Sequence, residues 1–113
     1  MELIEEGAAD VTIVAVAGRL DTQSVGRFSN RLGEIIHSGH AQLLIEASGL
    51  SHISSAGFRA LVLAARKATE HGGSLALCSM TPPVQRIVEI SGLELVIDTY
   101  ASREDALAKL AGG

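Results

Sequence analysis

Short apolar runs alternate with helix-like spacings along most of this chain. Nearly continuous apolar runs at residues 11–17, 42–47 and 74–79 predict interior strands, and a shorter run at residues 95–97 predicts one more. Residues 3–5 are expected to pair with the first of these runs across a turn at residues 7–10. The pattern therefore predicts a sheet with one antiparallel edge.

Between these runs, apolar residues return at intervals of three and four, which is typical of amphipathic helices. The first predicted helix is capped by Asp21 or Thr22 and ends near Ser38; its apolar positions are Val25, Phe28, Leu32, Ile35 and Ile36. The second helix follows a Ser-Ser-Ala-Gly corner and ends near His71; its expected apolar face is Phe58, Leu61, Val62 and Ala65.

Two further helices are predicted mainly from the residues expected at their ends. Proline is well tolerated at the first helical position, so Thr81 and Pro82 predict a start, and Gly92 predicts the stop. Ser102 is the expected cap of a last helix that runs to about residue 110. We therefore predict an α/β fold over residues 1–113: one domain with a mixed, mostly parallel sheet of four to five strands, covered by about four helices.

Composition narrows the function classes. The formal charge is −4 and aromatic residues make up 3% of the chain, which argues against a nucleic-acid-binding surface. Cys78 is the single cysteine, which fits a reducing compartment, and no apolar run approaches a membrane span. The acidic amino terminus does not resemble a secretory signal, so we expect a cytoplasmic protein without membrane insertion.

The corner between the strand at residues 42–47 and the second helix holds the main candidate site. Ser54 and Ser55 fall at the start of that helix, where unpaired backbone N–H groups and the helix dipole favour an acceptor oxygen or a phosphate. A serine at this place is either a cap or a group that carries a phosphate.

Three stretches together resemble the STAS domains of bacterial anti-sigma factor antagonists. They are Gly-Arg-Leu-Asp at residues 18–21, Ile-Ser-Ser-Ala-Gly-Phe at residues 53–58, and Pro-Pro-Val-Gln-Arg-Ile at residues 82–87 with Ser-Gly-Leu at 91–93. Each motif alone is weak, but their order and spacing match the family over essentially the whole chain.

The resemblance implies a regulator that switches partners. In that family the unphosphorylated antagonist binds an anti-sigma factor that is also a serine kinase, and a sigma factor is released. Phosphorylation of one serine at the start of the second helix ends binding, and a PP2C-type phosphatase resets the switch. Matched at the glycine, the acceptor falls on Ser55, with Ser54 as the alternative and in the place of the family's aspartate. The switch surface then comprises Asp21, Ser54, Ala56, Gly57, Phe58 and Arg59.

Two other functions are alternatives to this one. STAS domains of this size also occur as scaffold subunits of lipid-transport ABC complexes, without phosphorylation, and the family includes both monomers and homodimers. A hydrolase with Ser54 or Ser55 as nucleophile and His52 as base lacks the Gly-x-Ser-x-Gly elbow. We therefore expect no enzyme activity, no cofactor and no metal, and we expect Cys78 to be a core residue.

Overall fold

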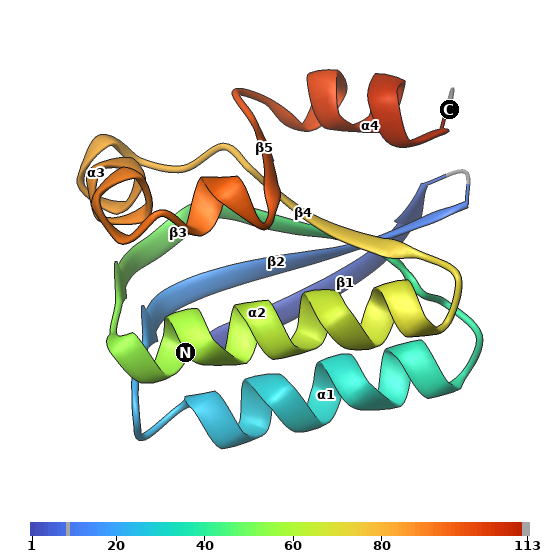
Figure 1. Cartoon of the computed structure of the whole chain (residues 1–113), viewed down its shortest axis with the longest axis horizontal. Coiled ribbons are helices and arrows are strands. Elements are labelled where there is room, and N and C mark those ends of the chain that lie inside the picture. Colours follow the sequence, from blue (N-terminus) through green and yellow to red (C-terminus); the bar gives the residue numbers. More distant parts are fainter. Residues whose placement is uncertain (9, 112–113) are drawn as a thin grey trace.

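The computed structural model describes residues 1–8 and 10–111, and in these it shows five strands and four α-helices. Figure 1 shows one sheet with α1 (Val25–His37) and α2 (Ser55–Glu70) side by side on one face, and α4 (Arg103–Ala111) on the other. The third helix, α3 (Pro82–Ser91), lies toward one end of the sheet and is followed by the 3₁₀ turn η1 (Leu93–Leu95). The predicted α/β class is confirmed.

The strands follow one another across the sheet in chain order. The first, β1 (Glu2–Ala8), is antiparallel to β2 (Val11–Leu20), whereas β3 (Gln42–Ile53), β4 (Ser74–Cys78) and β5 (Asp98–Tyr100) continue in parallel. The predicted opening hairpin is confirmed, but its turn is shorter than the expected residues 7–10: Gly7 and Ala8 belong to β1 and pair with Thr12 and Val11 of β2. Position 9 lies outside the described residues. Both β2 and β3 are longer than their apolar runs predict, and they end side by side.

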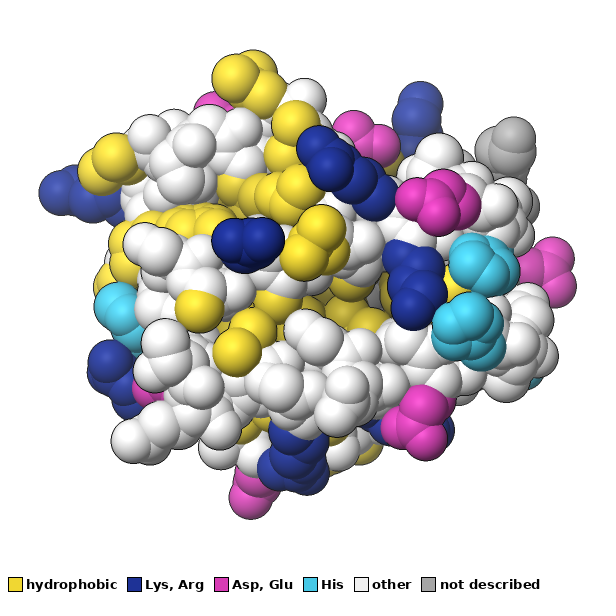
Figure 2. All heavy atoms as spheres, turned by 60° about the horizontal axis from the view of Figure 1, so that its bottom comes forward, with side chains coloured by type: hydrophobic (Ala, Val, Ile, Leu, Met, Phe, Trp, Pro, Cys, Tyr) yellow, Lys and Arg dark blue, Asp and Glu magenta, His cyan; other side chains and the backbone are white. Residues whose placement is uncertain are grey.

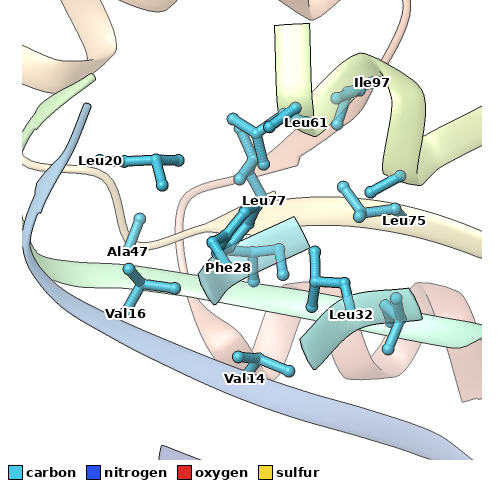
Figure 3. Close-up of a cluster of buried hydrophobic side chains, with 14 of the residues drawn as sticks. Val14, Val16, Leu20, Phe28, Leu32, Ala47, Leu61, Leu75, Leu77 and Ile97 are labelled. Atoms are coloured by element: carbon cyan, nitrogen blue, oxygen red, sulfur yellow. The ribbon is translucent and has the colours of Figure 1, made fainter. Parts of the chain in front are cut away.

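The main core lies between the sheet and the pair α1–α2. Figure 3 shows Phe28 and Leu32 of α1 pointing toward Val14 and Val16 of β2. Phe28 is fully buried, and the rest of this core is aliphatic. A second, smaller core lies under α4 and contains Val11, Ile13, Leu44, Ala76, Cys78 and Ala106. The prediction that Cys78 is buried is confirmed, and this burial raises the pKa of its thiol.

Two neighbouring glutamates on the edge strand link it to both helical layers. Glu5 forms an ion pair with Arg31 of α1, and Glu6 forms one with Arg103 of α4 at 2.7 Å. Successive side chains of a strand point to opposite faces, so β1 is held from both sides of the sheet. The hydrogen bond and positive charge of Arg31 hold the pKa of Glu5 below its ordinary value.

Two local predictions are wrong. Residues 95–97 are not a strand: Leu95 ends η1, and the last strand is Asp98–Tyr100. The apolar side chains there do not line up along a strand, because Leu93 and Ile97 point into the core while Leu95 and Val96 are exposed. Neither Asp21 nor Thr22 is the N-cap of α1; Ser24 occupies that position.

Candidate functional site

The candidate site lies where β2 and β3 end at the same edge of the sheet. Leu20 and Ile53 are paired at the end of the ladder, and the backbone N–H of Ser54 donates to the Leu20 carbonyl oxygen at 2.9 Å. Asp21 directly follows Leu20, and Ser54 and Ser55 directly follow Ile53. The parallel sheet therefore brings two of the three predicted motifs to one edge, as expected for functional groups in such sheets.

Gly57 allows this close approach. It is buried, and a Cβ placed on it would lie 2.8 Å from the Leu20 carbonyl oxygen and 3.0 Å from a methyl carbon of Ile53. A contact of 2.8 Å to backbone cannot be relieved by rotating a side chain. The first turn of α2 can therefore pack on the end of β2 only because residue 57 has no side chain.

The two adjacent serines have different surroundings. The Ser54 hydroxyl is half-buried and accepts a hydrogen bond from the Gly57 backbone N–H at 3.2 Å, so Ser54 is the N-cap of α2. Ser55 is the first residue of the helix and is exposed. Within the described residues, its hydroxyl makes no hydrogen bond. Ser54 thus has a structural role, whereas the hydroxyl of Ser55 is available to another molecule.

Asp21 organises the loop after β2. Its carboxylate accepts hydrogen bonds from the backbone N–H groups of Gln23 at 3.0 Å and Ser24 at 3.3 Å, and it pairs with Arg19 at 3.5 Å. Desolvation opposes the charged carboxylate, but hydrogen bonds from Gln23, Ser24 and Arg19 outweigh it and lower the pKa of Asp21. Asp21 therefore stays ionised beside the site and shapes the turn that precedes α1.

A hollow of about 400 Å³ opens beside Ser55, between α2 and the segment that joins α3 to η1. Its polar side has Ser55 and Arg59, and its lining is completed by Phe58, Val62, Ser91, Gly92, Leu93 and Val96. A second hollow of about 460 Å³ shares Val62 and Val96 and continues along α2 past Ala65 to Arg66. Together the two hollows form a groove, called the α2 groove below, that begins at Ser55.

The elements that form this groove, α2 and the α3–η1 segment, also carry exposed apolar side chains. Leu95 of η1 and Ile90 of α3 are 86% and 81% exposed, and Leu63 of α2 is 51% exposed. Figure 2 shows apolar side chains gathered on this side of the molecule, with Lys and Arg side chains among them. Exposed apolar surface of this kind, next to charged residues, is typical of protein-binding sites.

The predicted switch residues therefore fall into two groups. Asp21, Ser54 and Gly57 form the junction of β2 with α2, while Ser55, Phe58 and Arg59 line the hollow. Ala56 lies in the first turn of α2 and is half-buried. The sequence did not identify Val62, Leu93 and Val96 as lining residues, nor did it show that Ile90 and Leu95 are exposed. The signal available was an apolar residue at every position of residues 95–97 without strand-like alternation.

The arrangement does not form a hydrolase triad. No hydrogen bond joins Ser54 or Ser55 to His52 or Asp21 in the described part of the chain, and His52 lies in β3, paired with Arg19 of β2. In residues 1–8 and 10–111 no His, Cys, Asp and Glu side chains gather as metal ligands do. Over the same residues, no helix has both the length and the apolar content to cross a membrane.

Comparison with known proteins places these motifs in one family. The STAS domain model matches residues 3–106. BtrV of Bordetella bronchiseptica, which is provisionally named an anti-sigma factor antagonist, is 28% identical over 108 residues, covering 96% of this chain and 93% of BtrV. The anti-sigma F factor antagonist of Paenibacillus polymyxa is 26% identical over 101 residues, covering 88% of this chain and 86% of that protein.

Solved structures share the fold at lower identity. The unphosphorylated form of the anti-sigma factor antagonist SpoIIAA superimposes with a TM-score of 0.82 at 20% identity, over 99% of this chain and 98% of SpoIIAA. The phosphorylated form of SpoIIAA from Bacillus gives a TM-score of 0.72 at 19% identity, over 96% and 98% of the two chains. With a five-stranded mixed sheet, four helices and a family match over residues 3–106, the chain belongs to the STAS-domain family.

Proposed function

We propose that this protein is an anti-sigma factor antagonist controlled by phosphorylation of Ser55. Its partner is an anti-sigma factor that is also a serine kinase, and binding frees a sigma factor in the cytoplasm. Two curated relatives carry the name of anti-sigma factor antagonist, and SpoIIAA has been solved both with and without its phosphate. A PP2C-type phosphatase reverses the modification.

The observation that carries this proposal is that the two serine hydroxyls have different roles. Ser54 already uses its hydroxyl to cap α2, whereas Ser55 presents its hydroxyl to solvent at the helix N-terminus. In the transfer step the Ser55 oxygen bonds to the γ-phosphorus of ATP, the bond from that phosphorus to the β,γ-bridging oxygen breaks, and ADP leaves. The hydroxyl proton passes to a base supplied by the kinase.

The phosphate acts on docking more than on folding. It carries about −1.5 to −2 charges at neutral pH, and an interface that buries this charge without a partner weakens by several kcal/mol. About 3 kcal/mol already reduces affinity more than a hundredfold. The helix N-terminus favours the phosphate in the free protein, so the modified domain stays folded.

The experiment uses the serine kinase encoded nearest to this protein's gene, with ATP and mass spectrometry of the intact protein. We expect one added phosphate on the parent and on Ser54→Ala, and none on Ser55→Ala. A phosphate that persists in Ser55→Ala and is lost in Ser54→Ala contradicts the assignment. No phosphate at all, together with co-purification of a transporter ATPase, identifies a constitutive scaffold subunit instead.

A further inference from the structure

Arg59 borders the same hollow as Ser55, and the proposed phosphorylation switch gives Arg59 no role. The two residues are four apart in α2 and therefore lie on the same side of the helix, one turn from each other. Both line the hollow at the start of the α2 groove. A group attached to the Ser55 oxygen therefore extends into a space that the Arg59 side chain also borders.

Arg59 is also uncommitted. Three other arginines form ion pairs: Arg19 with Asp21, Arg31 with Glu5 and Glu34, and Arg103 with Glu6. In the part of the chain that the structure describes, Arg59 forms no ion pair and is exposed. Its guanidinium can therefore take up a new anion without breaking an existing contact.

Other groups at the hollow supply little competing charge. The side formed by α3 and η1 contributes Ser91, Gly92, Leu93 and Val96, none of which is charged. On the β2 side, Asp21 and Arg19 are paired with each other. The first-turn N–H groups of α2 add a positive end of the helix dipole, and the one on Gly57 is already bonded to the Ser54 hydroxyl.

We propose that Arg59 is an intramolecular clamp for the phosphate on Ser55 and holds it over the mouth of the hollow. This inference rests on the proposed function, because it concerns the phosphorylated state of the same serine. The guanidinium donates two parallel hydrogen bonds to phosphate oxygens, which fixes the phosphate at the entrance instead of leaving it mobile in solvent. Phosphorylation then releases the partner by blocking the entrance of the apolar hollow as well as by charge.

The experiment requires no kinase, because phosphoserine is inserted at position 55 during translation. The second pKa of the phosphate is measured by ³¹P NMR in this protein and in the same protein with Arg59→Gln. A cation held against the phosphate stabilises the dianion, so Arg59→Gln should raise that pKa by about half a unit. Because the helix N-terminus and Arg59 both stabilise the phosphate, phosphoserine should also raise the Tm of the parent, and it should raise the Tm of Arg59→Gln by less.

Arg66→Gln is the matched control. Arg66 is also an exposed arginine of α2, but it lines the second hollow and does not line the hollow beside Ser55. It should leave the phosphate pKa and the rise in Tm as they are in the parent. Equal phosphate pKa values in the parent and in Arg59→Gln overturn the clamp. That result leaves the kinase experiment unaffected, so the failure of the clamp is distinguishable from the failure of the switch.

Discussion

The inner and outer faces of α2 carry different kinds of residue. The inner face buries Gly57, Ala60, Leu61, Ala64 and Ala68 against the sheet and α1. The outer face presents Ser55, Phe58, Arg59 and Val62 to the α2 groove. Small side chains on the inner face let the helix approach the sheet closely. On the outer face, the apolar side chains of Phe58 and Val62 are only half-buried.

This difference separates stability from recognition within one helix. Residues on the inner face are fixed by close packing, so substitutions there should unfold the domain before they affect a partner. Residues on the outer face pack only on one side, so substitutions there should change binding and leave folding nearly intact. The loss of stability that a substitution causes therefore shows whether the residue belongs to the inner or to the outer face.

The largest effect is expected for Leu61→Ala. Leu61 is 1% exposed and belongs to the main core, so truncation leaves a cavity and lowers the free energy of unfolding by about 2–5 kcal/mol. Its outer-face control is Val62→Ala, which should cost less than about 1 kcal/mol because Val62 borders the groove. Urea unfolding measures both, and equal losses would show that the two faces are not distinct.

Gly57→Ala should have the next largest effect. The added methyl meets the Leu20 carbonyl at 2.8 Å, and forcing the helix away from β2 costs about 1–3 kcal/mol. The control is Gly26→Ala in α1, where a Cβ meets nothing within 4 Å and the better helix propensity should stabilise by about 0.5–1 kcal/mol. Thermal unfolding should therefore show shifts of opposite sign, and a stabilising Gly57→Ala contradicts the close approach.

Ser54 and Ser55 should differ in the same assay by a smaller amount. Ser54→Ala removes the cap of α2 and leaves the Gly57 N–H without its acceptor, at a cost of about 1 kcal/mol. Ser55→Ala removes an exposed hydroxyl and should change stability by less than about 0.5 kcal/mol. If Ser55→Ala is the more damaging of the two, Ser55 is a structural residue.

The smallest effect concerns Asp21 and depends on pH. Its pKa is lower in the folded than in the unfolded protein, so its charge contributes stability above the unfolded pKa of about 3.9 and loses it as pH falls through the folded pKa. Asp21→Asn should therefore lower Tm slightly at pH 7, with a difference that shrinks toward pH 3. A difference that is constant with pH would assign the role of Asp21 to shape alone.

Much of the fold could be predicted because periodicity reports burial. The run at residues 42–47 falls in β3, and the run at 74–79 falls in β4 except for Ser79, which follows the strand. Ser102 caps α4 by accepting the Asp105 N–H at 3.1 Å. The spacing of apolar residues gave a wrong prediction where apolar residues are exposed. Residues 95–97 were expected to form a strand, but Leu95 and Val96 lie at the surface beside the groove.

The site could be predicted only in part. The motif placed Ser54 and Ser55 at a helix start, yet it could not show which hydroxyl the helix uses as its cap. Nor could it show the groove, because Val62 and Leu93 come together only when α2 and η1 pack on the same side of the sheet. Phe58, Val62 and Ala65, which were expected on the apolar face of this helix, are half-buried: they pack against the main core and also border the groove.

The most direct test of the account is calorimetric titration of the anti-sigma factor kinase with two forms of this protein, one with serine and one with phosphoserine at position 55. The account predicts tight binding of the unmodified form and at least a hundredfold weaker binding of the phosphorylated form, with the two forms equally well folded by circular dichroism. Equal affinities of the two folded forms would contradict it.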